Sequence, residues 1–349
     1  MKSIRDLEFE PGTRVLVRID VNEPIDEVGI PQDTFRLEKM VPTIQYLQQQ
    51  DARVVLMAHL GKPDGRQVPG LRLDYISKEL ARLCGCSIQM IDGITGPTVE
   101  RAVDQLEPGQ VCMLQNLRFD PREEENSDKL ALELSKLGDI YVNEAFSVSH
   151  RAHASVVAIT KYLPSYAGLL LSQEIQILTD VVERPARPAV AIIGGAKIET
   201  KLPVIKVLQD HFDTVLVGGK IANEYLDTYK TAQKPNVILP VDFANEDRFD
   251  LGEQTVAQFS QYLETAATVV WNGPLGWVEK PPYDKATKAV AEVIAKNEDS
   301  YSVMGGGETV DEIKKLGKET KIDFISTGGG AMLEFIAKEG RLPGIEALK

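Results

Sequence analysis

Two lysines that follow a pair of glycines are the residues whose spacing points most directly to chemistry. In residues 189–201, AVAIIGGAKIETK, an apolar run leads into Gly194 and Gly195, and Lys197 and Lys201 stand one helical turn apart. The apolar run predicts a buried parallel strand, and the glycines allow a sharp turn into a helix. A helix N-terminus carries unpaired N–H groups and about half a positive charge, so two ammonium groups there predict an anion site, most simply for phosphate. A tight turn with two solvated lysines is the alternative.

Glycine-rich strand ends recur through the second half of the chain, and this repetition favours the phosphate site. They are TVLVGGK at 214–220, TVVWNGP at 268–274, SVMGGGET at 302–309 and FISTGGG at 324–330. Ligands of parallel sheets bind beyond the carboxyl ends of the strands, so these segments predict the walls of one phosphate-rich pocket. The P-loop spacing is absent, and no well-formed G-x-G-x-x-G follows the first strand, which argues against those two nucleotide-binding motifs.

Polar side chains gather after the strands predicted in the first half. They are Arg18, Asp20 and Asn22 after the first strand, His59 and Lys62 after the second, Asn116 and Arg118 after the fourth, and Asn143, Glu144, His150, Arg151 and His153 after the fifth, with Arg36 opening the first helix. Arginine is concentrated in this half, and its planar guanidinium makes bidentate contacts with carboxylates and phosphates. A single histidine is more often structural than a ligand. Together, however, these residues predict a donor-rich pocket for a small polyanion.

Strand-like and helix-like runs alternate through both halves, which predicts two doubly wound α/β domains with parallel sheets. Strands are expected at 14–18, 53–58, 87–91, 111–114 and 139–143 in the first half, and at the glycine-terminated segments and 236–239 in the second. Residues 168–182 predict one amphipathic helix, and the proline-rich residues 183–188 predict a hinge. The domains are therefore expected at 1–167 and 188–340, joined by 168–187. The acidic run 119–129 is expected to be a solvated loop that leads into a helix.

Composition limits the classes of function. The chain has 349 residues and a net charge of −13, which favours two domains and argues against a nucleic-acid or membrane-surface partner. No apolar run reaches about 18 residues, and the N-terminal segment is charged where a signal peptide would be apolar. Cys84, Cys86 and Cys112 fit neither a disulfide framework nor a zinc pattern, so we expect a cytoplasmic protein with reduced thiols.

Two α/β domains, one with an oxyanion cluster and one with a phosphate cradle, predict phosphoryl transfer between two ligands. That chemistry requires positioning and charge neutralisation more than a protein nucleophile, and no nucleophile motif is present.

The chain resembles the phosphoglycerate kinase family over almost its whole length. The motifs that carry the resemblance are, in order, VLVRIDVNEP, LMAHLGKPDG, MLQNLRFDPREEEN, DIYVNEAFSVSHRAHAS, AIIGGAKIETK, ILPVDF, VVWNGPLG, GGGET, STGGGAMLEF and LPGIEAL. The resemblance implies two Rossmann-like lobes joined by a hinge helix, with the tail 341–349 returning to the first lobe. It also implies reversible transfer of the acyl phosphate of 1,3-bisphosphoglycerate to MgADP, giving 3-phosphoglycerate and MgATP, by a cytoplasmic monomer.

Matching positions imply roles for individual residues. Glycerate binding falls to Asp20, Asn22, Arg36, His59, Arg118 and Arg151. Catalysis falls to Arg36, Lys197, Gly306 and Gly329. Nucleotide binding falls to Gly195, Lys201, Gly219, Asn272, Trp277, Glu279, Gly305, Gly306, Gly307, Glu308 and Thr309, with Glu279 on the ribose and Glu308 also the Mg²⁺ ligand.

Several positions depart from the family pattern. Lys62 replaces an arginine, Lys220 the third glycine of a triplet, Glu308 an aspartate that serves the metal, and Trp277 a small apolar residue beside adenine. The chain is shorter than usual between residues 229 and 236 and between 243 and 251, where the second gap removes most of a segment of the adenine wall. Trp277 either stacks on the base or fills the vacated volume as core. Two other functions stay open, a family member that binds or regulates without efficient catalysis, and a kinase with another phosphoryl carrier.

Overall fold

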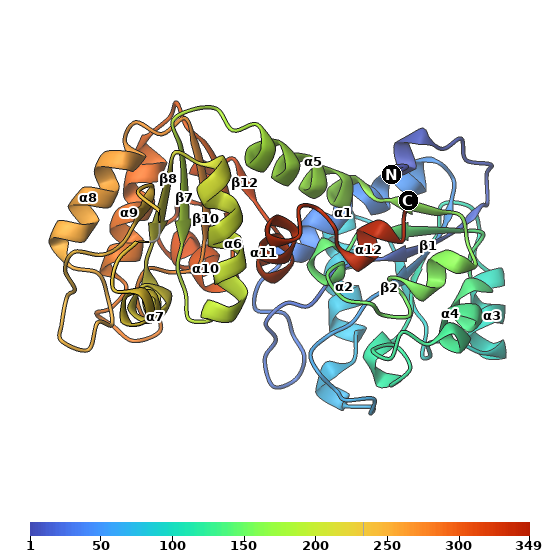
Figure 1. Ribbon diagram of the computed structural model, residues 1–349. Helices are drawn as coiled ribbons and strands as arrows, with labels where there is room; N and C mark the ends of the chain where they lie inside the picture. Colours follow the sequence, from blue (N-terminus) through green and yellow to red (C-terminus); the bar gives the residue numbers. More distant parts are fainter. Residues whose placement is uncertain (233) are drawn as a thin grey trace. The chain divides into compact units, whose positions relative to one another are not determined.

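The computed structural model describes residues 1–232 and 234–349, and the chain divides into two units (Figure 1). The first unit contains Met1–Glu174 and Arg341–Lys349, and the second contains Ile175–Gly340. The division falls within helix α5 (Leu169–Glu183), inside the segment 168–187 that the sequence marks as the connection.

The first unit is built on a six-stranded parallel sheet with the strand order β3-β4-β2-β1-β5-β6. Its strands are β1 (Arg14–Arg18), β2 (Arg53–Met57), β3 (Ile88–Met90), β4 (Val111–Met113), β5 (Ile140–Asn143) and β6 (Ser165–Ala167). Its helices are α1 (Phe35–Gln49), α2 (Asp74–Cys84), α3 (Pro97–Asp104), α4 (Asp128–Ser135) and α12 (Pro343–Glu346), which lies in the C-terminal tail. Within this unit, the Gly344 amide donates to the Ser149 carbonyl at 2.8 Å.

The second unit repeats the architecture with the strand order β12-β11-β10-β7-β8-β9, again all parallel (Figure 1). Its strands are β7 (Ala189–Ile193), β8 (Thr214–Val217), β9 (Val237–Ile238), β10 (Thr268–Asn272), β11 (Tyr301–Gly305) and β12 (Phe324–Ile325). Its helices are α6 (Ile198–His211), α7 (Gly219–Tyr229), α8 (Glu253–Leu263), α9 (Lys285–Lys296), α10 (Gly307–Lys315) and α11 (Gly329–Ala337). The two sheets confirm the predicted α/β fold class.

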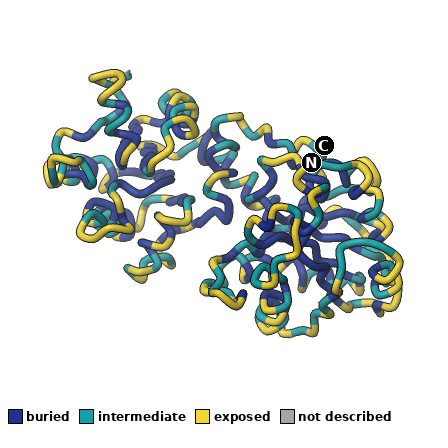
Figure 2. The backbone as a smooth tube through the Cα atoms, turned by 90° about the horizontal axis from the view of Figure 1, so that it is seen from below, coloured by how far each residue is buried: buried dark blue, intermediate teal, exposed yellow. Residues whose placement is uncertain are grey.

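The central strands are buried, as expected for parallel sheets that helices cover on both faces. Every residue of β7, β8 and β10 is buried, and Figure 2 shows the buried segments at the middle of each unit. The sequence did not predict β6, because three residues are too few to show a strand period.

The strand orders place a topological switch point in each sheet, where successive strands run to opposite sides. It lies between β1 and β5 in the first unit and between β7 and β10 in the second. Crevices at the carboxyl ends of such strand pairs are where open α/β sheets bind ligands. The glycine-rich segments follow β7 and β10, and Asp20 follows β1, so the motifs fall at the expected places.

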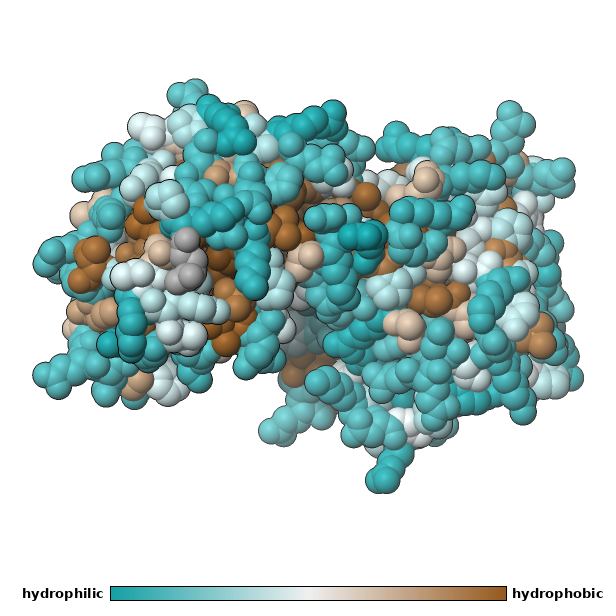
Figure 3. Space-filling model, in the orientation of Figure 1, coloured by the Kyte–Doolittle hydropathy of each residue, from teal (hydrophilic) through white to brown (hydrophobic). Residues whose placement is uncertain are grey.

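The surface is mainly hydrophilic on the face that Figure 3 shows. Within the described parts of the chain, no helix is long and apolar enough to cross a membrane. The three cysteines are free thiols.

Candidate functional site

A cavity of about 490 Å³ lies in the second unit at the ends of β7, β10 and β11. It is lined by Gly195, Ala196, Lys197, Thr200, Lys201, Asn272, Gly273, Pro274, Gly306, Gly307, Glu308, Thr309, Gly329, Gly330, Leu333 and Glu334. The first turns of α6, α10 and α11 all contribute to this lining. Three helix N-termini present unpaired N–H groups and partial positive charge, which suits a polyphosphate.

Glycine is required where the backbones at this cavity meet. Gly273 has φ +95°, and a Cβ added there would lie 2.3 Å from the Gly194 carbonyl oxygen and 2.9 Å from Lys201 Nζ. A Cβ at Gly329 would lie 2.5 Å from Gly306 Cα. Any larger residue at these positions would separate the segments, so the repeated glycines let the strand ends converge.

Lys201 lies in the first turn of α6 and is buried against β10. Its Nζ donates to Asn272 Oδ1 at 2.6 Å and to the Asn272 carbonyl at 3.2 Å. Burial lowers the pKa of Lys201 to about 8, and the carboxylate of Glu308 opposes that shift. The ammonium group is therefore held in place by two oxygens and is only partly compensated, which fits an anion as its missing partner.

The pKa of Lys201 predicts a pH dependence of definite sign for the nucleotide binding that the family resemblance implies. Raising the pH from 7 to 9 removes the proton in the free protein, so the Kd for ADP is expected to increase roughly tenfold by proton linkage. The phosphates of ADP are already ionised over this range, and titration calorimetry measures the change. In Lys201→Arg the guanidinium stays charged, so the pH dependence should flatten whatever the absolute affinity. A wild-type Kd that is constant from pH 7 to 9 would contradict the assignment.

Lys197 is the N-cap residue of α6 and is exposed. Among the described residues its ammonium group has no hydrogen-bond or ion-pair partner, although its charge weakly opposes the rise in the pKa of Glu308. Lys197 is thus an exposed cation without a partner among the described residues, whereas Lys201 is buried and bonded to Asn272.

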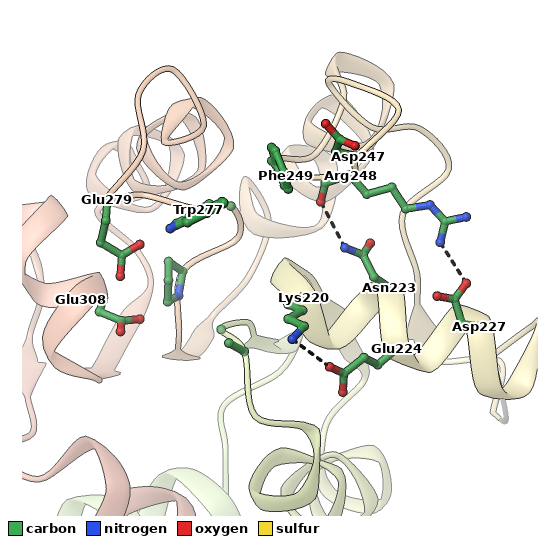
Figure 4. Close-up of a pocket in the computed structure, with 14 residues that line it drawn as sticks. Lys220, Asn223, Glu224, Asp227, Asp247, Arg248, Phe249, Trp277, Glu279 and Glu308 are labelled. Atoms are coloured by element: carbon green, nitrogen blue, oxygen red, sulfur yellow. Dashed lines mark hydrogen bonds and ion pairs between the residues drawn. The ribbon is translucent and has the colours of Figure 1, made fainter.

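A second cavity of about 560 Å³ continues from the first and shares Gly195, Ala196, Pro274 and Glu308 with it. Figure 4 shows Glu279 and Glu308 at one end of the row of lining side chains and Asp227, from α7, at the other. Trp277 and Phe249 lie between them with ring centroids 5.2 Å apart in an edge-to-face arrangement. Trp277 is 46% exposed, so it lines the cavity and is not a core residue.

Glu308 and Glu279 make the acidic end of this cavity suitable for a cation. Partial desolvation raises the pKa of the exposed Glu308 carboxyl, and the charge of Glu279 raises it further. Mg²⁺ prefers oxygen ligands and often takes only one or two carboxylates beside the phosphates of a nucleotide. Across residues 1–232 and 234–349, no three His, Cys, Asp or Glu side chains form a complete metal site. The residues therefore fit a metal that arrives with the nucleotide.

Most of the predicted nucleotide residues line the two cavities, but Gly219 and Gly305 line neither. Gly219 has φ +63°, and a Cβ there would lie 2.7 Å from the Gly195 nitrogen, so its role is a close backbone approach. Gly305 ends β11, where a Cβ would lie 2.5 Å from Met332 Sδ. The buried hydroxyl of Thr309 has no partner among the described residues and lines the smaller cavity, where a phosphate oxygen would satisfy it.

The shortened stretches have different outcomes. Residue 233, inside the first of them, lies outside the described residues. The second forms a loop closed by an isolated antiparallel bridge between Phe243 and Leu251. Its Asp247, Arg248 and Phe249 line the larger cavity, so the wall is rebuilt and not absent. These residues and Asn223 of α7 were missed, because no motif marks them.

In the first unit, four of the predicted glycerate residues are joined in one hydrogen-bond chain. Arg36 Nη1 donates to Asp20 Oδ2 at 3.1 Å and to the Asn22 carbonyl at 3.0 Å. Asn22 Oδ1 accepts from the Gly61 amide at 2.8 Å, and the Gly61 carbonyl accepts from Arg118 Nη1 at 2.8 Å. This chain connects the ends of β1 and β2 to the loop after β4.

Behind this chain lies a buried basic cluster. Arg18 Nη2 and His59 Nδ1 are 3.0 Å apart, and because a guanidinium only donates, Nδ1 is the acceptor. Burial first, and then Arg18 and Arg118, lower the pKa of His59 well below its usual value. The same causes lower the pKa of His153 to about 3. Both histidines are neutral at neutral pH, so the positive charge of the cluster comes from arginine.

Arg118 leaves buried donor capacity in this cluster. Its Nε lies 3.0 Å from Glu124 Oε1, while its buried Nη2 has no partner among the described residues. Arg151 is exposed, and its Nε donates to His150 Nε2 at 3.1 Å. Its charge contributes to the lowered pKa values of Arg118 and His59, which places it at the same cluster. Lys62 is exposed in the loop after β2.

The solvated acidic loop expected at 119–129 is wrong for Glu123, whose side chain is fully buried. Glu123 accepts from Ser155 N at 2.9 Å and Ser155 Oγ at 2.5 Å. Arg18 Nε donates to the same hydroxyl at 2.9 Å, so the buried carboxylate supports the arginine. Three consecutive glutamates look alike in sequence, and only the fold selects one for burial.

Glu144 was expected at the polyanion pocket, but it caps α5 instead. Its carboxylate accepts from the Leu170 amide at 2.9 Å and from the Leu171 amide at 3.0 Å, and burial raises its pKa to about 7. A Cβ at Gly168 would lie 2.0 Å from Glu144 Oε2, so the glycine makes room for the cap.

Comparison with known proteins gives the same family at every level. The family model described as phosphoglycerate kinase matches residues 4–237 and 230–339. A phosphoglycerate kinase from Desulforapulum autotrophicum is 40% identical over 394 aligned positions that cover 100% of both chains. One from a Roseiflexus species is 39% identical and covers 99% of this chain and 98% of the relative.

Solved structures agree with the sequence comparisons. Phosphoglycerate kinase from Pyrococcus horikoshii has a TM-score of 0.86 at 30% identity, covering 100% of this chain and 98% of its own. The enzyme from Coxiella burnetii has a TM-score of 0.84 at 30% identity, covering 99% and 98%. This chain therefore belongs to the phosphoglycerate kinase family, a family of phosphotransferases with a carboxyl group as acceptor.

Proposed function

We propose that this protein transfers the acyl phosphate of 1,3-bisphosphoglycerate reversibly to MgADP, giving 3-phosphoglycerate and MgATP. The observation that carries the proposal is the cavity where Lys197, Lys201 and the N-termini of α6, α10 and α11 meet. Phosphoryl transfer is accelerated chiefly by positioning and by neutralising the charge on the moving group. A cavity with two lysines and three helix N-termini supplies both.

The glycerate is assigned to the first unit. Arg36, Arg118 and Arg151 supply cationic donors for its carboxylate and phosphate, and His59 supplies a neutral hydrogen bond. Asp20, which is buried and paired with Arg36, fixes that guanidinium and leaves it able to accept a second anionic partner. The acyl phosphate would thus be bound by groups that neutralise its negative charge and hold it in place without reacting with it.

The nucleotide is assigned to the second unit. Lys201 and Asn272 hold its phosphates, Glu279 its ribose, and Lys197 follows the phosphoryl group as charge develops on it. Gly306 is the N-cap residue of α10, and Gly329 is the first residue of α11. Both present backbone N–H groups to the same phosphate oxygens. Glu308 would hold the Mg²⁺, which neutralises phosphate charge when bound. We also propose that the protein is a cytoplasmic monomer.

A coupled assay with purified protein and three acceptors tests the function. With 1,3-bisphosphoglycerate as donor, ADP is expected to support turnover, GDP to support it at a comparable rate, and pyrophosphate to support little. Turnover with pyrophosphate alone would favour another phosphoryl carrier. Absence of turnover with all three, in a protein that binds its ligands, would favour a binding or regulatory protein.

Truncation of Trp277 tests the base site. Trp277→Ala is expected to raise the Kd for ADP roughly tenfold, because base–aromatic stacking contributes about 1–3 kcal/mol. Since Trp277 is 46% exposed, thermal stability should change little, in contrast to the loss of about 3–5 kcal/mol that follows truncation of a core aromatic residue. Titration calorimetry and thermal unfolding measure the two quantities. Tyr301→Ala, an exposed aromatic residue outside both cavities, is the control. A stability loss without a change in ADP affinity would contradict stacking.

A further inference from the structure

A cation lies among three aromatic rings beside the larger cavity. Lys280 Nζ is 4.8 Å from the ring centroid of Phe249, 4.9 Å from that of Trp277 and 5.8 Å from that of Tyr283. The rings themselves touch edge to face, with centroids 5.1 Å apart for Phe249 and Tyr283. We call these four residues the aromatic cluster. An ammonium group near several ring faces is attracted to each of them, so Lys280 holds the rings together.

The backbone ties the aromatic cluster across two segments that are distant in sequence. The Trp277 amide donates to the Phe249 carbonyl at 2.8 Å, and the Lys280 amide donates to the Trp277 carbonyl at 3.0 Å. Next to Phe249, the buried Asp250 accepts from the Ala286 amide at 3.1 Å. These hydrogen bonds fix the backbone positions of the aromatic residues, and the Lys280 cation fixes the orientation of their rings.

The aromatic cluster has an inner and an outer side. Trp277 and Phe249 line the cavity, whereas Lys280 and Tyr283 are not among its lining residues. The cation therefore acts from behind the wall and leaves the cavity to a ligand. On the inner side, Trp277 neighbours Glu279, the residue assigned to the ribose, in the same lining.

We propose that Lys280 is a positioning residue of the nucleotide site, which holds the Trp277 indole in the orientation that stacks on the nucleobase. The inference rests on the proposed function for the identity of the nucleotide. It assigns the rebuilt wall of the shortened segment to base binding by ring faces. It also gives Lys280, a residue that does not line the cavity, a supporting part in that binding.

Titration calorimetry with ADP and with pyrophosphate tests this role. Lys280→Met keeps most of the stem and removes the charge, so the Kd for ADP is expected to rise on the order of two- to fivefold. The Kd for pyrophosphate, which has no base, should stay within error. Lys280→Arg retains a cation that binds to ring faces and is expected to restore most of the ADP affinity. Lys285→Met, an exposed lysine outside the cavity lining, controls for the lost charge.

Fluorescence adds a readout that belongs to Trp277. The chain has two tryptophans, and Trp271 is fully buried, so acrylamide quenching reports mainly on Trp277. ADP should protect the wild type from quenching and protect Lys280→Met less. Equal loss of ADP and pyrophosphate affinity in Lys280→Met would show a long-range charge effect and overturn the proposal, as would unchanged ADP affinity. Wild-type protein that binds ADP but transfers no phosphoryl group would overturn the proposed function without altering the binding comparison.

Discussion

Replacement of Lys197 by alanine is expected to lower kcat on the order of 10²–10³-fold while leaving 3-phosphoglycerate binding nearly unchanged. Effects of that size follow when an enzyme loses one preorganised positive charge that stabilises the negative charge developing in the transition state. Lys197 suits this role because it caps α6 at the cavity and has no partner among the described residues. Lys201, in contrast, is fixed to Asn272. Rapid-quench kinetics measure the chemical step, and calorimetry measures the binding of each ligand.

Lys206→Ala is the matched control for this prediction. Lys206 is an exposed lysine on the same helix that does not line either cavity, so its loss changes the net charge equally and should leave kcat within about twofold. A Lys197→Ala variant that turns over as fast as the wild type would contradict the phosphoryl-transfer role.

Replacement of Arg36 or Arg151 by alanine is expected to raise the Kd for 3-phosphoglycerate roughly ten- to a hundredfold and to leave the Kd for ADP unchanged. Each lost charge-assisted hydrogen bond contributes about 1.5–3 kcal/mol. Arg36 has the larger structural part. Without it, the buried Asp20 carboxylate keeps, among the described residues, the hydrogen bonds from the Ser147 hydroxyl and the Asn22 amide. Arg151 is exposed, so its effect should be on binding alone.

Calorimetry with each ligand separates these effects, and thermal unfolding shows whether Arg36→Ala also destabilises the first unit. Arg101→Ala, an exposed arginine on α3 away from the cluster, serves as the control and should change neither affinity. Equal weakening of ADP and 3-phosphoglycerate would indicate a general folding defect and count against the assignment of these arginines.

The nucleotide cavity could be predicted from sequence because its parts are coded locally. Each wall is an apolar strand followed by glycines, and the requirement for glycine at Gly273 or Gly329 comes from backbones that meet at one point. The parallel sheet then brings all the strand ends to one edge. Periodicity and glycine spacing therefore determine both the fold and the place of the cavity.

Which of several similar polar residues is buried could not be predicted in this way. Glu123 pairs with Ser155 beneath Arg18, although nothing local separates it from the glutamates that follow it. Glu144 lies one residue past β5, at the edge of the sheet where polar groups often bind ligands. Its carboxylate instead accepts hydrogen bonds from the amides at the start of α5. These roles depend on contacts between segments far apart in sequence.

The aromatic cluster shows the same limit at the nucleotide site. A shortened segment suggests a missing wall, but the loop that the Phe243–Leu251 bridge closes places Phe249 against Trp277. A deletion shows which residues are gone, whereas the packing of those that remain sets the new surface. The pairing of Phe249 with Trp277 and Lys280 follows only from the folded chain.

Single-turnover transfer between the two proposed substrates tests the central claim most directly. Protein in excess is mixed with γ-³²P-labelled MgATP and 3-phosphoglycerate, quenched on the millisecond scale, and the label is followed into an acyl phosphate that hydroxylamine cleaves. We predict rapid label transfer in the wild type, and transfer slowed on the order of 10²–10³-fold in Lys197→Ala with both ligands still bound. Wild-type protein that binds both ligands but moves no label, or that moves it equally fast without Lys197, would contradict the account.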